Sequence, residues 1–226
     1  MSAGEASVET IPLGSVEELR TQAGRYRFLA RLLAAPPDAS LVEDAVAVGL
    51  LESGDESRLE ALQVEFTRLF SAPGPTAVPV YQSIYTDTLK IEPSQDEANC
   101  GVSFPGGEFK GHLGGTSCQE AANWYRRAGY EVPSTEMSDH ISVQLGFLAH
   151  LMLAEAREIE MGRGADGLAW RQVRCSFFEN FLGRWVGAFC GRLRADGSSL
   201  FYRQVAGRLE SELSTLTSRE NKPCLD

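Results

Sequence analysis

Residues 138–161 have the sequence SDHISVQLGFLAHLMLAEAREIEM, in which large apolar side chains recur at three- and four-residue steps. Residues at these steps share one face of an α-helix, and an apolar face must be buried against other parts of the chain. We therefore predict a long helix over residues 138–161 whose buried stripe contains Ile141, Leu145, Leu148, Met152 and Ile159.

A second apolar stripe lies closer to the C-terminus. Phe177, Phe181, Trp185 and Phe189 recur at four-residue steps, and Phe178 and Leu182 widen the same face. This periodicity predicts one helix over residues 165–193. We expect its aromatic stripe to face a common core with Ile141, Leu145 and Leu148.

Start and stop signals place further helices along the chain. Four segments begin with Ser-x-x-Glu, the capping box in which two side chains satisfy backbone N–H groups at a helix N-terminus. These pairs are Ser15/Glu18, Ser40/Glu43, Ser57/Glu60 and Ser117/Glu120. Prolines and polar turns end several of the segments. The additional predicted helices cover residues 15–35, 40–51, 57–70, 117–128 and 198–216.

The remaining segments have no helical period. Residues 83–89 suggest one short helical turn, and the glycine-rich residues 92–115 predict a long loop. We find no convincing alternating strand, no hairpin dipeptide and no internal repeat. The sequence therefore predicts an all-α fold of the helical-bundle type, with about eight to ten helices in one domain over residues 1–226. Residues 1–14 and 217–226 are expected to be flexible tails.

The composition limits the possible partners. With 226 residues, of which 43% are hydrophobic, the chain needs neither disulfides nor a metal to build a core. Its net charge of -10 argues against nucleic acid, because phosphate binding depends on clustered Lys and Arg. Two interpretations stay open: the acidity attracts a cationic partner, or it only keeps the protein soluble.

The sequence also indicates a compartment. No apolar run approaches the roughly 18 residues of a membrane span, and the acidic start MSAGEASVETIPLG is unlike a secretory leader. The five cysteines form an odd set without a CxxC pair, which suits free thiols in a reducing environment. We therefore expect a cytoplasmic protein whose free thiols are Cys100, Cys118, Cys175, Cys190 and Cys224.

No cofactor site is complete in the sequence. The glycines of the 92–115 segment match neither GxxxxGK[ST] nor a GxGxxG between a strand and a helix. Cys100, His112 and Cys118 could in principle share a zinc ion, but structural zinc sites usually draw four ligands from close pairs, and the sequence offers no second pair. We predict that no tightly bound metal or nucleotide accompanies the chain.

Two segments are polar or aromatic where a bundle does not need them to be. Tyr81 and Tyr85 lie in a loop that follows a Pro-rich stretch, and tyrosines on loops are typical of peptide-binding surfaces. Asp139 and His140 open the long helix; on an ideal helix, His140 lies at the edge of the apolar stripe and Asp139 points away from it. The alternatives are that the tyrosines only anchor the loop and that Asp139 only caps its helix.

The order of these segments resembles the TorD/DmsD/NarJ family of redox-enzyme maturation chaperones, over residues 19–216. The segments that carry the resemblance are EFTRLF at 65–70, PVYQSIY at 79–85, Tyr125 with Gly129-Tyr130, Asp139-His140-Ile141, and the aromatic set Phe178, Phe181, Leu182, Trp185 and Phe189. The chain departs from the family pattern in two places. It has Ser138 where the family often has Pro, and Gln144 or Gly146 where the family has an acid.

The resemblance implies a function. Such chaperones bind the N-terminal leader, often of twin-arginine type, of the catalytic subunit of a molybdopterin-containing oxidoreductase, and they act as monomers or homodimers. They hold the client until its cofactor is inserted and it can be exported or assembled. Carried over by position, the client site comprises Leu69, Phe70, Tyr81, Ser83, Tyr85, Asp139 and His140. Tyr81, Tyr85, Asp139 and His140 should converge on one groove, with Asp139 supplying charge complementarity to the basic leader.

Two other classes of function stay open. An all-helical enzyme would use Asp139 and His140 as an acid–base pair, but the sequence offers no nucleophile or catalytic cofactor site beside them, and we expect no enzyme. A structural or regulatory subunit would stay bound to one partner permanently. The sequence does not identify the client oxidoreductase, the type of its leader, the oligomeric state or the role of the 92–115 segment.

Overall fold

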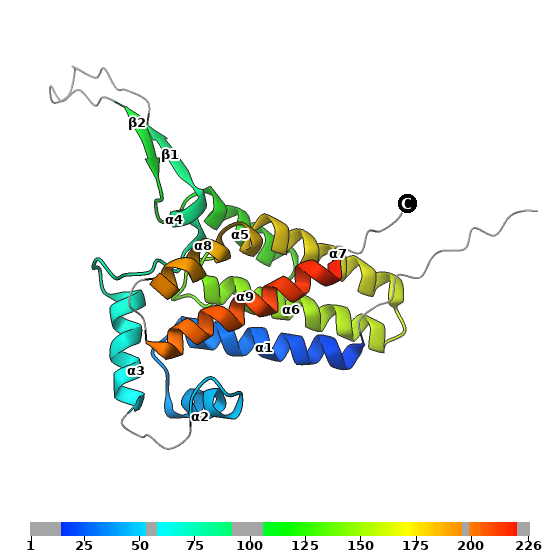
Figure 1. Ribbon diagram of the computed structural model, residues 1–226. Coiled ribbons are helices and arrows are strands. Elements are labelled where there is room, and N and C mark those ends of the chain that lie inside the picture. The colour runs from blue at the N-terminus through cyan, green and yellow to red at the C-terminus, as the bar shows by residue number, and fades with distance from the viewer. Residues whose placement is uncertain (1–14, 53–57, 92–105, 196–198, 221–226) are drawn as a thin grey trace, which may run out of the picture.

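The computed structural model describes residues 15–52, 58–91, 106–195 and 199–220. Most of these residues are helical (Figure 1). The N-terminal part contains α1 (Val16–Ala34), α2 (Ala39–Ala47), α3 (Arg58–Phe66), the π-helical turn η1 (Thr67–Ser71) and the short α4 (Gln82–Thr86). The second part contains α5 (Thr116–Arg127), α6 (Ile141–Glu160), α7 (Gly164–Asn180), α8 (Leu182–Ala195) and α9 (Leu200–Glu220). The all-α prediction is confirmed, with nine α-helices in the described ranges.

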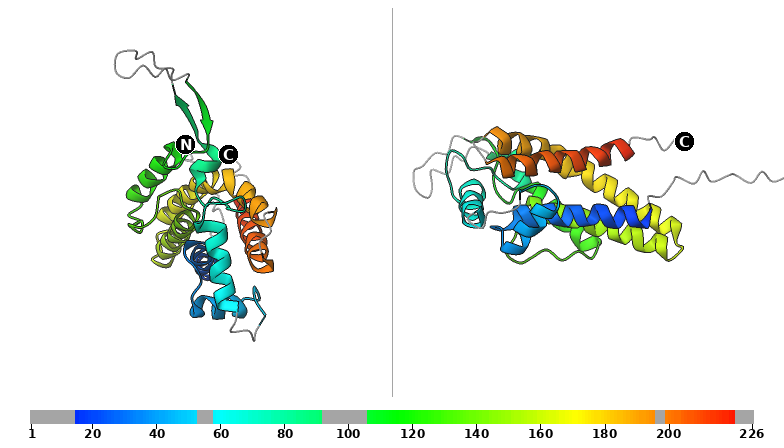
Figure 2. Two further views of the ribbon diagram at one scale, coloured as in Figure 1. Left: turned by 90° about the vertical axis from the view of Figure 1, so that its left-hand side faces the viewer. Right: turned by 60° about the horizontal axis from the view of Figure 1, so that its bottom comes forward.

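Helix α6 is the centre of the core, since it packs against both α1 and α7 (Figures 1 and 2). The predicted stripe residues Ile141, Leu145 and Leu148 are fully buried. The aromatic stripe shares their core, because the Phe177 ring lies 4.7 Å from both Phe147 and Phe181 between centroids. The expected core face of the two long segments is therefore confirmed.

The predicted single helix over residues 165–193 is wrong, because the chain breaks at Phe181. This residue has φ -120° and ψ -91°, which ends α7, and α8 begins at the next residue. Its ring nevertheless stays 2% exposed in the core. The aromatic period thus continues across the break, so periodicity gave no sign of it.

A small ribbon replaces part of the predicted loop. Strand β1 (Thr88–Ile91) pairs antiparallel with β2 (Gly107–Lys110), and Leu89 lies opposite Phe109. The ribbon projects from the helical body beyond α4 (Figure 1). The predicted absence of strands is therefore wrong here, and the turn expected over residues 83–89 is a helix up to Thr86 followed by a strand. Residues 92–105 lie outside the described part.

The capping boxes were predicted with mixed success. The Ser15/Glu18 box is present, with both reciprocal bonds. Helix α2 instead begins after Asp38, whose carboxylate accepts the Leu41 N–H at 2.7 Å. Helix α5 begins after Gly115, and Asp87 of the preceding segment accepts the Ser117 N–H at 2.9 Å. Ser57 lies outside the described residues.

The ends of the chain also differ from the prediction. Helix α9 continues to Glu220, so residues 217–220 are helical and not part of a tail. Residues 1–14 and 221–226, predicted as flexible tails, lie outside the described part. Within the described ranges, no helix combines the length and apolar character that crossing a membrane would require.

Candidate functional site

The expected loop with the two tyrosines is partly helical, because Tyr81 is the N-cap residue of α4 and Tyr85 lies inside that helix. This segment, residues 79–85 (the tyrosine loop), is joined directly to the start of α6. The Gln82 N–H donates to the Asp139 carbonyl at 3.0 Å, and the Ile141 N–H donates to the Val80 carbonyl at 2.8 Å. These bonds form an isolated antiparallel bridge between Tyr81 and His140. The two segments that the sequence singled out therefore lie side by side, although their residues Ser83 and Asp139 are 56 positions apart in the chain.

Asp139 is buried and caps α4. Its Oδ2 accepts the Ser83 N–H at 3.0 Å, and the residue is 0% exposed. The expectation that Asp139 points away from the apolar stripe is wrong, because α6 begins only at Ile141 and a helical angle does not apply to Asp139. An acid in this position holds the tyrosine loop against α6 and does not face a ligand.

His140 caps α6. Its Nδ1 accepts the Ser142 N–H at 3.1 Å, and its Nε2 lies 3.8 Å from a Glu136 carboxylate oxygen. The residue is 4% exposed, and this burial lowers the pKa of His140 to about 4, although the Asp139 charge raises it. The imidazole is therefore neutral at physiological pH and serves as a hydrogen-bond acceptor.

The lowered pKa of His140 predicts a loss of stability in mild acid. The unfolded chain binds a proton near pH 6.5 while the folded chain does not until about pH 4, so unfolding becomes easier as the pH falls through this window. Between pH 7.5 and 5 the loss from this group should be on the order of 2 kcal/mol. Urea unfolding of wild type and His140→Asn measures it, because Asn can cap a helix but does not titrate. Equal pH dependence of the two proteins would contradict the assignment.

The two tyrosines are half-buried. The Tyr81 ring lies 5.1 Å from the His140 ring in an edge-to-face arrangement. The Tyr85 hydroxyl donates to the Pro79 carbonyl at 2.7 Å, and its ring lies 5.1 Å from Trp185. Both rings thus anchor the loop, as the simpler interpretation expected, while each keeps part of its surface accessible.

The sequence analysis did not predict a run of buried side-chain hydrogen bonds beneath the tyrosine loop. The Trp185 Nε1–H donates to Gln144 Oε1 at 3.0 Å, and the Gln144 amide donates to Gln82 Oε1 at 2.6 Å. Gln144 and Gln82 are 0% and 2% exposed. One feature of the sequence indicates these hydrogen bonds: Gln144 interrupts the predicted apolar stripe of α6, and a buried amide needs hydrogen-bond partners.

Position 146 does not offer room for the acid that the family pattern has in this region. A Cβ added to Gly146 would lie 2.5 Å from the Tyr130 hydroxyl, so a side chain there would displace the ring. Gln144, the other candidate position, is held by Trp185 and Gln82. The departure from the family pattern is therefore built into the packing of α6.

The other two predicted client-site residues, Leu69 and Phe70, lie apart from the tyrosine loop and the start of α6. Leu69 is 0% exposed, and its carbonyl accepts the Val78 N–H at 2.7 Å. Phe70 is half-buried and packs on Phe66 and Tyr202, with ring centroids 5.0 Å and 5.3 Å away. Both residues belong to the packing of η1 and α9. They are linked to the tyrosine loop through the ring contacts Phe70–Phe189, Phe189–Trp185 and Trp185–Tyr85.

The geometry does not support an acid–base pair. His140 Nδ1 and Asp139 Oδ2 are both engaged by backbone N–H groups at helix starts, and both side chains are buried. Among the described residues, no group of three His, Cys, Asp or Glu side chains could hold a metal ion. Cys100, one of the three ligands considered from the sequence, lies outside the described part.

Comparison with known proteins agrees with the family resemblance that the motifs indicated. Residues 33–191 match the family described as nitrate reductase delta subunit. The chain is 26% identical to the chaperone protein TorD of Vibrio cholerae over 182 residues, which are 80% of this chain and 69% of the relative. It is 24% identical to the chaperone protein TorD of Colwellia psychrerythraea over 192 residues, which are 82% and 75% of the two chains.

A solved crystal structure of an Archaeoglobus fulgidus protein covers 91% of this chain and 99% of its own, with 23% identity and a TM-score of 0.46. At that score the likeness does not bear on function. The family match covers most of the described helices, from the end of α1 into α8. The chain therefore belongs to the nitrate reductase delta subunit family, which is the TorD/DmsD/NarJ family that its motifs resemble.

Proposed function

We propose that this chain is a cytoplasmic, non-enzymatic chaperone for the catalytic subunit of a molybdopterin-containing oxidoreductase. It binds the N-terminal, twin-arginine-type leader of that subunit and assists folding, cofactor insertion and the timing of export or assembly. Family membership supports the chaperone role, since the two relatives are named as chaperones. The observation that carries the leader site is the bridge between Tyr81 and His140, which joins the two segments least explained by core packing.

The residues of this site have different tasks. Tyr81 and Tyr85 are partly accessible and supply rigid amphipathic contact area for the apolar part of a leader. Ser83, Asp139 and His140 are buried and act as positioning residues, because they fix the loop on α6. The acid that can meet a basic leader head is Glu136, whose side chain is 25% exposed beside His140.

The charge of other surfaces favours this location. A cleft of about 510 Å³ on α1 and another of about 340 Å³ between α1 and α6 are both lined by Arg27 and Arg31. These guanidinium groups repel a basic segment. The tyrosine loop has Glu136 near it instead, within a chain of net charge -10.

We expect Tyr81→Ala and Tyr85→Ala each to weaken leader binding by roughly 1–3 kcal/mol, because aromatic anchors dominate such interfaces. The measurement is calorimetric titration with a synthetic leader peptide that has two adjacent arginines followed by an apolar segment. Phe109→Ala is the matched control, since Phe109 is a 48% exposed aromatic residue on the ribbon. Unchanged affinity in both tyrosine variants, with melting curves that show them folded, would place the leader elsewhere.

The salt dependence of leader binding tests the role of Glu136. Affinity should fall as salt rises, and Glu136→Gln should flatten this dependence. Glu131→Gln changes an exposed acid in the same connection between α5 and α6 and should leave the dependence nearly unchanged. A leader peptide with both arginines replaced by glutamine should bind wild type and Glu136→Gln equally. Identical salt curves for the Glu136 and Glu131 variants would contradict a role of Glu136.

A further inference from the structure

A groove of about 510 Å³ lies on the outer face of α1, away from the tyrosine loop. Thr21, Gly24, Phe28 and Arg31 line it at three- and four-residue steps, so they form one stripe of α1. The other wall comes from α2 and the residues after it, including Val48 and Leu50, and Arg208 of α9 closes one side. Figure 1 shows α2 below α1 and α9 on the opposite side of α1.

The groove combines an apolar floor with positive charge. Leu29 and Leu50 are buried beneath it, whereas Val48 at its edge is 51% exposed. Its lining includes four arginines and one acid, namely Arg25, Arg27, Arg31, Arg208 and Asp44. A chain with net charge -10 thus concentrates cationic side chains in one concave surface. Such a surface attracts an anionic partner and repels the basic leader.

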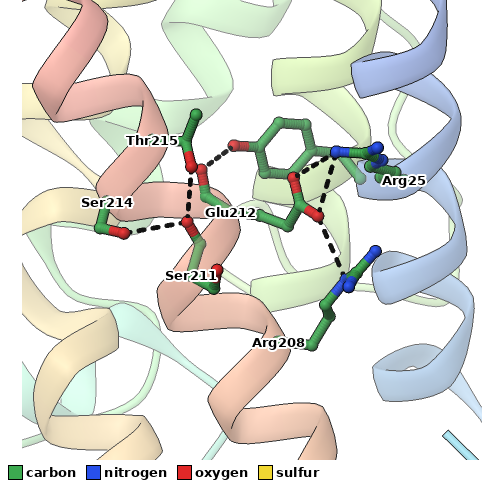
Figure 3. Close-up of polar contacts among 7 residues, drawn as sticks. Arg25, Arg208, Ser211, Glu212, Ser214 and Thr215 are labelled. Carbon is green, nitrogen blue, oxygen red and sulfur yellow. Dashed lines mark hydrogen bonds and ion pairs between the residues drawn. The ribbon is translucent and has the colours of Figure 1, made fainter. Parts of the chain in front are cut away.

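Buried and surface acids hold the guanidinium groups at the groove without neutralising it. Arg25 and Arg208 share the carboxylate of Glu212, at 3.5 Å and 3.2 Å (Figure 3). The Glu212 side chain is 7% exposed, whereas the two arginines are 48% and 46% exposed. Two cations therefore share one buried anion, and their outer N–H groups face solvent.

The remaining arginines add to this excess of charge. Arg31 pairs with Asp44 at 2.8 Å and lies 3.9 Å from Asp38. Arg27 forms no ion pair with any residue of the described ranges. Even when the carboxylates of Glu212, Asp38 and Asp44 are all counted, the four arginines keep one positive charge in excess. An acidic ligand would find guanidinium donors that are already positioned.

Gly24 makes room for a closely packed ligand. Apart from proline, glycine is the least favourable residue inside a helix, and Gly24 lies in the middle of α1. A Cβ added there would meet no other atom within 4 Å, so the internal packing of the fold does not require glycine. Glycine at such a position lets another backbone or side chain approach the helix closely.

We propose that this groove binds an acidic, amphipathic helical segment of a partner polypeptide. Its apolar side chains would cover Phe28 and Val48 over Gly24, and its carboxylates would bind Arg25, Arg27 and Arg208. This is the helix-in-groove mode of recognition combined with an arginine cluster for acidic groups. The site does not depend on the proposed leader site, since it lies on other elements and selects the opposite charge.

The test uses the full chain and a display library of short linear peptides as the probe. Peptides that bind wild type should be enriched in Glu and Asp beside Leu, Ile or Phe at helical spacing. One enriched peptide is then synthesised, together with a copy in which every acid is replaced by its amide. The acidic peptide should bind at least tenfold more tightly than the amide copy, and its affinity should fall as salt rises.

Variants then locate the site. Gly24→Leu fills the groove and should reduce affinity at least tenfold, while Gly187→Leu, at an exposed glycine of α8 with equally open surroundings, should have no effect. Arg27→Gln should weaken binding several-fold, and Arg127→Gln, at an exposed arginine of α5, should not. Tyr81→Ala should leave this affinity unchanged, which separates the result from the leader experiment.

Several outcomes would overturn the proposal. These are a library without enrichment, enrichment of basic peptides, or peptides that bind Gly24→Leu and Arg27→Gln as tightly as wild type. Equal binding of the acidic peptide and its amide copy would also overturn it. If a small organic anion such as naphthalene sulfonate binds and the peptides do not, the groove is a small-ligand site. If the chain self-associates, dilution strengthens peptide binding and Gly24→Leu abolishes the self-association, the groove is instead occupied by a second copy.

Discussion

Trp185→Ala is expected to destabilise the chain by about 3–5 kcal/mol, because it empties the junction between the core and the tyrosine loop. Trp185 is 1% exposed and its ring lies 5.8 Å from Phe189 and 5.1 Å from Tyr85. The variant also leaves Gln144 Oε1 without its donor in a buried position. For a domain of ordinary stability, about 5–15 kcal/mol, this is a large fraction of the total.

Urea unfolding followed by circular dichroism measures this loss. Trp185→Phe keeps most of the ring but removes the Nε1–H, so it should cost less than the alanine variant and separate packing from the hydrogen bond. Val64→Ala is the control, because Val64 is 63% exposed on α3 and should change stability by less than about 0.5 kcal/mol. An unfolding midpoint of Trp185→Ala equal to that of wild type would refute the assigned core.

The sequence predicted the core well because the core is made of long helices. In α6, Ile141, Leu145 and Leu148 occupy one face, and local periodicity alone identifies that face. The prediction of helix bounds failed where the same local pattern fits two different backbone structures. The period of Phe177, Phe181 and Trp185 fits one helix or two helices that share a core, and only the backbone at Phe181 distinguishes them.

Contacts between distant segments account for the other errors. The β1–β2 ribbon pairs residues separated by the 92–105 segment. Polar and apolar residues alternate in Thr88–Ile91, but an alternation over four residues is too short to identify a strand without its partner. Similarly, Asp87 caps α5 and Asp139 caps α4, so each acid caps a helix other than the one next to it in the chain. Capping rules that consider only neighbouring residues in the chain assign such acids to the wrong helix.

The sequence predicted that the two segments of the candidate leader site lie together, but it did not predict the role of each residue. Its two segments were identified from residues that a bundle does not need, and the structure joins Tyr81 to His140. Burial then separates the group, since Asp139 is 0% exposed while the tyrosines are partly accessible. A sequence shows which residue types are present, but exposure depends on which segment covers them. We therefore propose Glu136, and not the buried Asp139, as the acid that complements the basic leader.

The second large effect is expected at the buried ion pair between α6 and α7. Glu155 and Arg174 are 1% and 5% exposed, and an Arg174 nitrogen lies 3.1 Å from Glu155 Oε2. Arg174→Met should destabilise the chain by about 3–5 kcal/mol, because it removes the Arg174 cation from a Glu155 carboxylate that stays buried. The double variant Glu155→Leu with Arg174→Met should recover most of this loss, because it removes both charges and refills the space with apolar groups.

The exposed pair Arg20–Glu160 is the matched control, since it also ends on α6 and has a similar distance of 2.8 Å. Its side chains are 50% and 54% exposed, so solvent screens the pair and Arg20→Met should cost less than about 1 kcal/mol. Urea unfolding of these three variants beside wild type gives the comparison. If Arg174→Met cost no more than Arg20→Met, the α6–α7 contact would not depend on its buried charges. If the double variant were as unstable as Arg174→Met, the loss would come from packing and not from removing the cation beside the buried Glu155 carboxylate.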